Sequence, residues 1–183
     1  MNLSKIALIA DEINKLGITW AVGASVMLYF HGLEDEPNDL DILVHESDAK
    51  QLDELLKKMG VREDKEYKET FATKYFYSYK VEGIKIDLMG GFIINHTDGK
   101  YKLTFDSETI VEFKIINGIK IPLSSLEDWY VIYQLIPNRE HRTQAIEKHL
   151  RENKVKNPYL LERALERDLP DLVKKRVRKI LNA

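Results

Sequence analysis

The sequence contains no cysteine, which excludes a disulfide framework, a thiolate nucleophile and a zinc site built from cysteine. Proline and glycine are scarce, with five and nine among 183 residues, so collagen-like and low-complexity chains are excluded as well. No uncharged run reaches the roughly 18 apolar residues that indicate a membrane-spanning helix. These absences predict a globular cytoplasmic protein with no membrane partner, in which carboxylates or histidines hold any metal ion.

Charge is nearly balanced overall but is unevenly distributed along the chain. The sequence has 28 Lys and Arg against 30 Asp and Glu, and its formal net charge is −2. Ten of the basic and five of the acidic residues fall within residues 151–183. A basic tail helix can contact phosphate, but cations near the end of a helix also interact favourably with its dipole. We therefore interpret these basic residues as a solvated helix face.

Hydrophobic periodicity predicts alternating helices and strands in the first third of the chain. Apolar side chains recur at spacings of three and four from Ile6 to Leu16, which indicates one buried helix face, and Gly17 then ends the helix. Short apolar runs with β-branched residues predict two buried strands. The predicted order is helix, strand, helix, strand, helix, over residues 3–16, 18–22, 25–31, 40–44 and 47–59.

Two β-hairpins and a helical tail are predicted for the rest of the chain. Alternation with period two defines the strands, and Asn117-Gly118 is the residue pair that a type I′ turn prefers. Ser124 and Glu127 have the spacing of a capping box, which predicts the start of a helix. The predicted hairpins pair residues 74–81 with 84–88 and 109–116 with 119–123, and further helices cover residues 139–151, 159–167 and 172–181.

These elements together indicate an α/β (α+β) fold, with a mixed β-sheet flanked by helices and a C-terminal helical tail. The pattern supports one boundary, near Leu123, where alternation gives way to helical spacing. We therefore predict a core over residues 1–123 and a C-terminal helical region over residues 124–183.

Asp39 and Asp41 form the first candidate site. They lie two residues apart at the start of a predicted strand, and side chains with this spacing point to the same face of a sheet. Two carboxylates held this close repel each other, and a hard cation such as Mg²⁺ relieves the repulsion. In the alternative interpretation, Asp39 completes a turn and Asp41 caps a local backbone amide.

Asp87 supplies a third carboxylate from a later strand. It lies on the polar face of residues 84–88, whereas Ile84, Ile86 and Leu88 share the opposite face. If this strand neighbours residues 40–44, the three acids share one patch, which suits two-metal phosphoryl transfer. Asp87 would then hold a metal ion or take the proton from the attacking hydroxyl. A lone aspartate in a strand is otherwise a solvent-facing or edge residue.

Gly23, Ala24 and Ser25 form a candidate phosphate site where a predicted strand runs into a helix. Free backbone N–H groups and the positive end of the helix dipole attract an anion there, and Ser25 adds a hydroxyl. We expect Gly23→Val to abolish nucleotide binding and to leave the protein folded. Small residues at a helix start also serve capping or tight packing, which is the alternative.

These motifs resemble those of the nucleotidyltransferase superfamily of the polymerase β type. Its signature is a hydrophobic residue, Gly, a small residue and Ser, followed about ten residues later by Asp-hydrophobic-Asp-hydrophobic. The resemblance implies that Asp39, Asp41 and Asp87 bind the metal, and that Asp87 is the general base. It also implies that Gly23, Ala24 and Ser25 contact the triphosphate of a bound NTP, and that two Mg²⁺ ions take part.

Among subfamilies, the chain is most similar to small stand-alone members related to antibiotic nucleotidyltransferases and to abortive-infection or toxin–antitoxin nucleotidyltransferases. Ala24 departs from the Gly or Ser that many members carry. Residues 139–143 have basic side chains but lack the acid of the Arg-x-x-Lys-Asp element that toxin-type relatives tend to carry. Lys74, Arg139 and Arg142 are candidate phosphate contacts or ordinary surface charges, and Tyr75, Tyr77 and Tyr79 stack a base or pack across strands.

The function that the resemblance implies is Mg²⁺-dependent transfer of a nucleoside monophosphate from an NTP, such as ATP, to a hydroxyl group. The sequence does not define the acceptor, which is a small molecule, a protein side chain or an RNA end. One alternative is a catalytically inactive nucleotide-binding or antitoxin-like module. A second alternative is a glycosyltransferase that uses Asp39-Leu40-Asp41 to hold the metal of a sugar nucleotide.

The pair of acids gives the first testable prediction. Asp41→Asn should substantially weaken the Mg²⁺-dependent binding of an NTP, because a hard cation loses one anionic oxygen ligand. Calorimetric titration of the variant with Mg²⁺ and an NTP measures this affinity, and an unchanged value would refute the metal-binding role.

Overall fold

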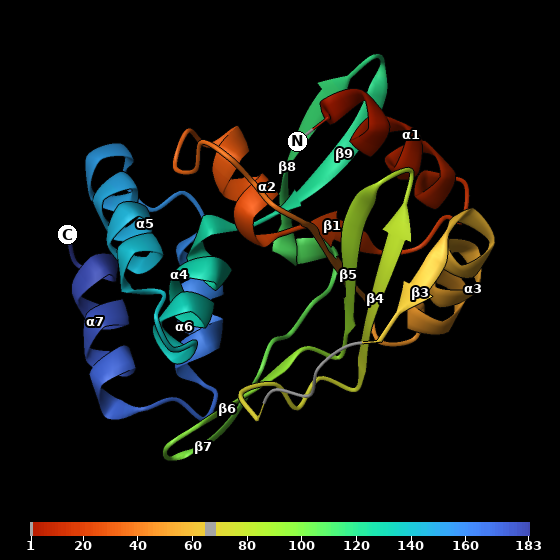
Figure 1. The fold of residues 1–183 in the computed structure, drawn as a ribbon. Helices are drawn as coiled ribbons and strands as arrows, with labels where there is room; N and C mark the ends of the chain where they lie inside the picture. Colours follow the sequence, from red (N-terminus) through yellow and green to blue (C-terminus); the bar gives the residue numbers. More distant parts are fainter. Residues whose placement is uncertain (1, 65–68) are drawn as a thin grey trace.

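A seven-stranded mixed sheet forms the centre of the protein in a computed structural model, which describes residues 2–64 and 69–183 (Figure 1). The strand order is β3-β4-β5-β2-β1-β9-β8, and β6 and β7 form a separate hairpin. The strands are β1 (Trp20–Val22), β2 (Leu40–Val44), β3 (Val61–Glu63), β4 (Tyr75–Val81), β5 (Ile84–Gly90), β6 (Ile93–His96), β7 (Gly99–Lys102), β8 (Ile110–Ile116) and β9 (Ile119–Ser124).

Helices lie on both sides of this sheet. In Figure 1, α4 to α7 form a group on the left, and α3 lies at the far right beside β3. Contacts of α3 with β4 and of α1 with β9 fix these two helices against the strands. The helices are α1 (Leu3–Asn14), α2 (Ala24–Phe30), α3 (Ala49–Met59), α4 (Leu126–Leu135), α5 (Glu140–Asn153), α6 (Pro158–Leu165) and α7 (Asp171–Leu181), with a 3-10 turn at Ser107–Thr109.

Strand direction makes the sheet mixed, as the sequence predicts. The central pairs β2–β5 and β1–β9 are parallel, whereas β1–β2, β3–β4, β4–β5 and β8–β9 are antiparallel. The turn between β8 and β9 also follows the prediction, because Asn117 and Gly118 have φ values of 51° and 80° and a type I′ turn requires both to be positive. The predicted α/β fold class is therefore confirmed.

One local prediction was wrong, and three strands were missed. The N-cap of α4 is Ser125, whose hydroxyl accepts the N–H of Asp128 at 3.0 Å, and not Ser124. Ser124 still belongs to β9, and its hydroxyl donates to the carbonyl of Val22 at 3.0 Å. The strands β3, β6 and β7 were not predicted, because three or four residues are too few to show a period.

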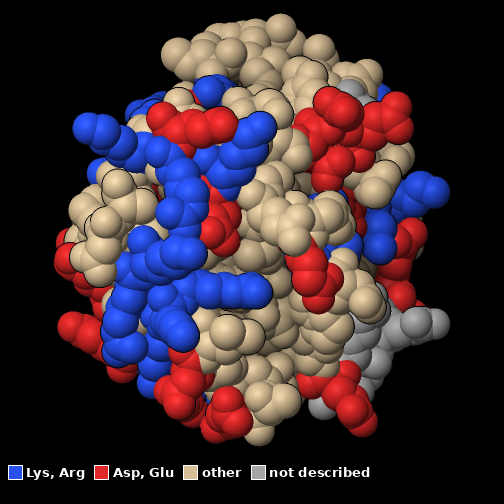
Figure 2. All heavy atoms as spheres, turned by 90° about the vertical axis from the view of Figure 1, so that its left-hand side faces the viewer, with Lys and Arg blue, Asp and Glu red and all other residues tan. Residues whose placement is uncertain are grey.

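One cluster of buried apolar side chains runs from α1 to α7 and joins the sheet to the tail helices. In α7, Val173, Val177 and Ile180 are buried, and the exposed positions after Leu172 carry basic residues. Figure 2 shows Lys and Arg side chains gathered on the side where α5 and α7 lie. The division at residue 123 stays a prediction. Within the described ranges, no helix has both the length and the apolar character needed to cross a bilayer.

Gly23 joins β1 to α2 in an extended conformation, with φ −124° and ψ −165°. Its N–H donates to the carbonyl of Asp41 at 2.9 Å, so this amide belongs to the sheet. A Cβ atom at this position would overlap Cζ2 of the Trp129 ring. The structure therefore contradicts the expectation that Gly23→Val leaves the protein folded, because Trp129 of α4 is only 2% exposed and has no room to move.

This contact predicts energetic coupling between Gly23 and Trp129. Gly23→Ala should lower the free energy of unfolding by about 1–3 kcal/mol, the usual cost of overpacking. Trp129→Phe gives the added methyl group space, so the double variant should lose less stability than the sum of the two single variants. Urea unfolding of all four proteins measures the coupling, and strictly additive losses would show that the two side chains do not meet.

Candidate active site

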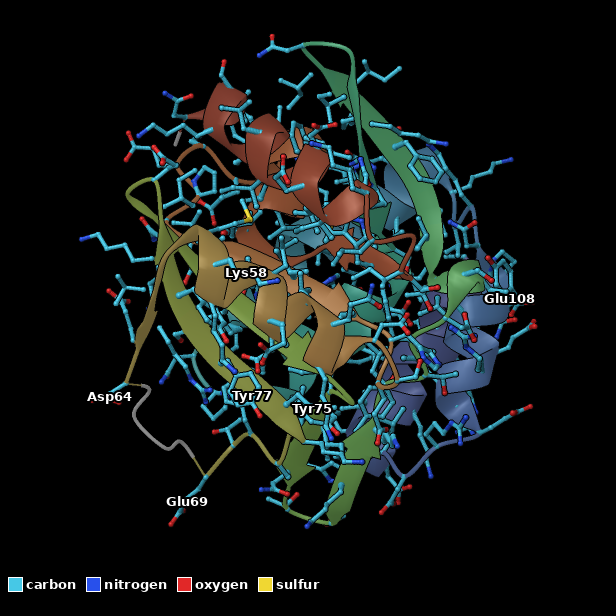
Figure 3. The ribbon with its side chains drawn as sticks, turned by 90° about the vertical axis from the view of Figure 1, so that its right-hand side faces the viewer. Lys58, Asp64, Glu69, Tyr75, Tyr77 and Glu108 are labelled. Atoms are coloured by element: carbon cyan, nitrogen blue, oxygen red, sulfur yellow. The ribbon has the colours of Figure 1, made fainter. Side chains whose placement is uncertain are left out.

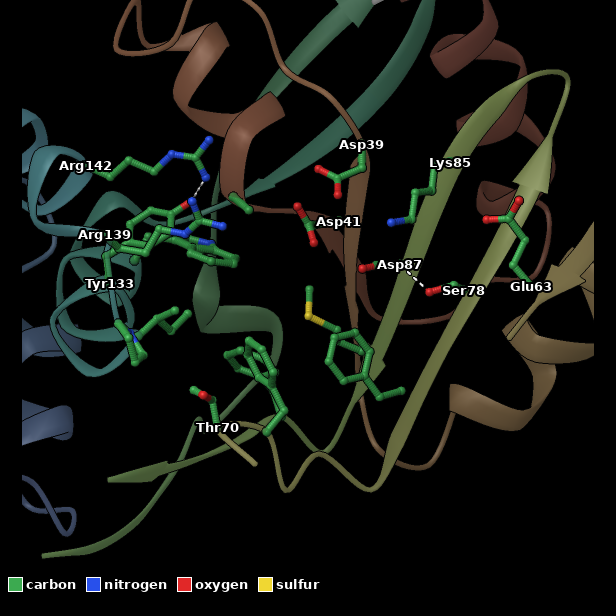
Figure 4. A pocket seen from close by; sticks show the side chains of 18 of the residues that line it. Asp39, Asp41, Glu63, Thr70, Ser78, Lys85, Asp87, Tyr133, Arg139 and Arg142 are labelled. Atoms are coloured by element: carbon green, nitrogen blue, oxygen red, sulfur yellow. Dashed lines mark hydrogen bonds between the residues drawn. The ribbon is translucent and has the colours of Figure 1, made fainter. Parts of the chain in front are cut away.

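A cavity of about 510 Å³ lies between the sheet and the helices α4 and α5. Figure 4 shows its walls, with the carboxylates and Lys85 on the strands and the arginines on the helical side. The described residues that line it are Ala24, Asp39, Asp41, Glu63, Asp64, Thr70, Phe71, Phe76, Ser78, Lys85, Asp87, Met89, Phe92, Trp129, Tyr133, Ile136, Pro137, Arg139 and Arg142. Its size is that of a small-molecule site.

The register of the sheet places four polar residues in one row across the cavity floor. Asp41 of β2 lies beside Asp87 of β5 in the parallel pair. Ser78 of β4 is the partner of Asp87 on the other side, and Glu63 of β3 is the partner of Ser78. Residues paired in this way project to the same face, so the row faces the cavity. Sequence analysis identified Asp41 and Asp87 but missed Glu63 and Ser78.

All three predicted carboxylates, those of Asp39, Asp41 and Asp87, line this one cavity. Asp39 precedes Asp41 by two residues and therefore shares its face of β2 (Figure 4). Asp87 is only 8% exposed, and its Oδ1 accepts a hydrogen bond from the Ser78 hydroxyl at 2.6 Å. The Asp87 side chain is thus largely shielded from bulk solvent.

The carboxylates fit a magnesium ion by their chemistry. Mg²⁺ keeps several waters and binds proteins through one or two carboxylates together with substrate phosphates. Within residues 2–64 and 69–183, no three His, Asp or Glu side chains are grouped closely enough to complete an ion site by themselves. The carboxylate oxygens of Asp39 and Asp41 are of the kind that Mg²⁺ binds, with substrate phosphate and water as its other ligands.

The corner formed by Gly23, Ala24 and Ser25 connects the acid-bearing strand to α2. Ser25 is 2% exposed, and its hydroxyl donates to the backbone carbonyl of Asp39 at 3.3 Å. Of the three residues, Ala24 lines the cavity. Ala24 has a φ of 46°, a left-handed conformation that costs a non-glycine residue about 1–2 kcal/mol. A ligand in the cavity can therefore contact the backbone at Ala24, whereas the Ser25 hydroxyl is bonded to the backbone of Asp39.

Two arginines at the start of α5 form the opposite wall. Arg142 donates to a carboxylate oxygen of Glu34 at 2.7 Å and to the Tyr133 hydroxyl at 3.2 Å. Its side chain is only 14% exposed, so it is not an ordinary surface charge. Burial raises the pKa of Tyr133, which keeps the ring a neutral phenol. Arg142 thus fixes α5 to the loop before β2, and Arg139 lines the cavity beside it.

Two other groups of candidates lie elsewhere. Lys74 pairs with Glu46 at 2.8 Å, and neither residue lines the cavity. Tyr75, Tyr77 and Tyr79 point to the face of β4 that α3 covers, where the Tyr79 hydroxyl donates to Asp53 (Figure 3 labels Tyr75 and Tyr77). None of the three tyrosines lines this cavity, and the rings of Tyr75 and Tyr77 instead contact each other along β4.

Solved structures with the same fold are nucleotidyltransferases. A protein from Thermotoga maritima described as a nucleotidyltransferase shares 24% identity, with a TM-score of 0.61 over 82% of this chain and 92% of its own. ANT(2'')-Ia, solved with adenylyl-2''-tobramycin, shares 11% identity, with a TM-score of 0.56 over 87% of this chain and 97% of its own. The lincosamide adenylyltransferase LnuA, solved with lincomycin, shares 14% identity, with a TM-score of 0.54 over 80% of this chain and 97% of its own. The fold is therefore that of a nucleotidyltransferase.

The sequence places the chain more narrowly. The model of the aminoglycoside-2''-adenylyltransferase family matches residues 5–152, a range that includes every residue lining the cavity. The chain belongs to this family and is an enzyme of the nucleotidyltransferase class. No curated protein matches the sequence significantly. The resemblance to antibiotic nucleotidyltransferases, stated above from the motifs, is confirmed.

The bond between Ser78 and Asp87 predicts a positioning role for Ser78. Ser78→Ala should lower the rate of nucleotidyl transfer about tenfold, because a hydrogen bond to a charged group contributes about 1.5–3 kcal/mol and the Asp87 carboxylate loses its fixed orientation. The affinity for an NTP with Mg²⁺ should not change. Ser78→Thr retains the hydroxyl and should recover most of the rate, whereas equal losses in both variants would indicate a packing effect.

Proposed function

We propose that the protein transfers a nucleoside monophosphate from an NTP to a hydroxyl group of a small-molecule acceptor, with Mg²⁺ as cofactor. The observation that supports this most directly is the convergence of Asp39, Asp41 and Asp87 on one cavity wall. ATP is the expected donor because the family and two of the structural neighbours are adenylyltransferases. A cavity of about 510 Å³ favours a small acceptor over a protein or an RNA end.

Each side chain has a defined part in this proposal. Asp39 and Asp41 hold Mg²⁺, which when bound neutralises phosphate charge and stabilises the charge that develops in the transition state. Asp87 lies beside Asp41 and takes the proton from the acceptor hydroxyl, or ligates a second ion. Ser78 keeps the Asp87 carboxylate oriented. The backbone at Ala24 and the guanidinium of Arg139 receive the β- and γ-phosphates.

The neighbours support a small hydroxylated acceptor in particular. ANT(2'')-Ia was solved with an adenylylated tobramycin and LnuA with lincomycin, and both are small antibiotics. The family match gives no support to a glycosyltransferase. Retention of all three acids in one cavity favours an active enzyme over an inactive nucleotide-binding module.

Asp87→Asn separates chemistry from binding. The variant keeps the size of the side chain, so nucleotide affinity should be retained while the transfer rate falls by about 10² or more, the usual contribution of a general base. Pyrophosphate release and titration with a nonhydrolysable ATP analogue measure the two quantities. Asp35→Asn, a change at an exposed acid outside the cavity, is the control. Loss of both quantities would make Asp87 chiefly a metal ligand, and full activity would show that Asp87 is not the general base.

A further inference from the structure

The cavity has an apolar side that the proposed reaction does not use. Five aromatic rings form a continuous wall from β4 to α4, with centroids 5.1 to 6.4 Å apart in successive pairs. Trp129 and Phe92 are nearly buried, whereas Phe71 and Phe76 are only partly buried. The rings belong, in order along the wall, to Phe76, Phe71, Phe92, Trp129 and Tyr133, and all five line the cavity.

This wall begins directly beside the proposed base. Phe76 and Met89 are partners in the β4–β5 pair, as are Ser78 and Asp87. The two pairs are separated by two residues on each strand, so they are neighbours on the same face of the sheet. If the hydroxyl of a bound molecule reaches Asp87, the atoms beside that hydroxyl therefore lie against the side chains of Phe76 and Met89.

The geometry of the reaction separates donor from acceptor. The attacking and leaving oxygens lie roughly in line on opposite sides of the reacting phosphorus. Pyrophosphate leaves toward Arg139, which lies on the far side of Asp41 from Asp87 (Figure 4). The attacking hydroxyl then approaches from the side of Asp87, Ser78 and Glu63. This side of the cavity is the acceptor end.

Glu63 adds one charge at the acceptor end. It closes the row that runs from Asp41 through Asp87 and Ser78, and its side chain is partly buried. A carboxylate near an apolar wall binds a protonated amine well, because the reduced exposure to water strengthens the ion pair. A sugar with many amines would instead have to remove water from several of them against aromatic rings, which is unfavourable.

We propose, on the basis of the function above, that the acceptor is a small amphipathic amino alcohol, with an apolar body against Phe76 and Met89 and a protonated amine near Glu63. Its hydroxyl oxygen forms a bond to the α-phosphorus of the NTP while the bond from that phosphorus to the β-phosphate bridging oxygen breaks. The hydroxyl proton passes to Asp87, and pyrophosphate leaves. The products are a nucleotidylated acceptor and pyrophosphate.

Three matched probes test the subsite. Phenylalaninol has the hydroxyl, the amine and a phenyl ring, alaninol lacks the ring, and 3-phenyl-1-propanol lacks the amine. Their affinities are measured by calorimetry with the wild-type protein, in the presence and in the absence of Mg²⁺ and the nonhydrolysable analogue AMP-CPP. Phenylalaninol should bind about tenfold more tightly than alaninol, since burying a phenyl group contributes at least this much. Equal affinities would overturn the proposal.

Variants then assign the two contacts. Phe76→Ala should reduce the ratio of phenylalaninol affinity to alaninol affinity to about threefold or less. Phe76→Leu should retain part of this ratio, and the affinity for AMP-CPP should be unchanged in both variants. Tyr75→Ala removes a ring from the opposite face of the same strand, so it should change neither the ratio of the two probe affinities nor the affinity for AMP-CPP. Glu63→Gln should weaken phenylalaninol several-fold and leave 3-phenyl-1-propanol unaffected.

Two further outcomes would count against the proposal. If Phe76→Ala weakens AMP-CPP binding and leaves the preference for the ring intact, the aromatic wall holds the nucleobase. If Glu63→Gln affects both phenyl probes equally, Glu63 does not bind the amine. Failure of AMP-CPP to bind the wild-type protein would instead refute the proposed function, and the probe affinities without nucleotide would still report on the subsite.

Discussion

The parallel pairing of β2 with β5 is the constraint on which the site depends. It places Asp41 beside Asp87, although 46 positions separate them in the chain. Side chains alternate between the faces of a strand, so a shift of one residue in this pairing would turn one of the two acids away from the cavity. The apolar side chains of Leu40, Ile42 and Leu88 oppose such a shift, because it would expose them.

A second contact holds the two walls of the cavity together. Gly23 leaves just enough room for the ring of Trp129, so the corner after β1 packs against the first turns of α4. The same helix carries Tyr133, which accepts a hydrogen bond from Arg142 of α5. The position of the arginines relative to the carboxylates is thus set by packing between buried groups and by an ion pair with Glu34, not by the sheet alone.

Local sequence patterns predict much of the secondary structure of this protein. They miss the site residues whose position depends on strand pairing and on contacts between distant parts of the chain. The bounds of β2 follow from a short apolar run with β-branched residues, and the turn at Asn117 follows from turn chemistry, and both signals act within a few residues. Glu63 could not be found in this way, because β3 has three residues and its place beside β4 is decided by tertiary contacts. Arg142 looked like a surface charge, since its partner Glu34 lies 108 positions away.

The aromatic wall was missed for a related reason. Phe76 stands between Tyr75 and Tyr77 in the sequence, and an aromatic run in a strand does not reveal which member faces a ligand. The structure separates them because the two faces of β4 have different neighbours, α3 on one and the cavity on the other. The signal was present in the alternation with Ser78, which shares the face of Phe76.

The row of polar residues also runs from the middle of the sheet to its edge. Asp41 and Asp87 lie on strands that have neighbours on both sides, whereas Glu63 lies on the three-residue edge strand β3, whose Val61 is 70% exposed. Short edge segments open locally at a lower free energy than central strands. Under the proposed function, the nucleotide would lie on central strands and the acceptor beside a short edge strand, so that the acceptor end could change in sequence without a shift in the β2–β5 pairing.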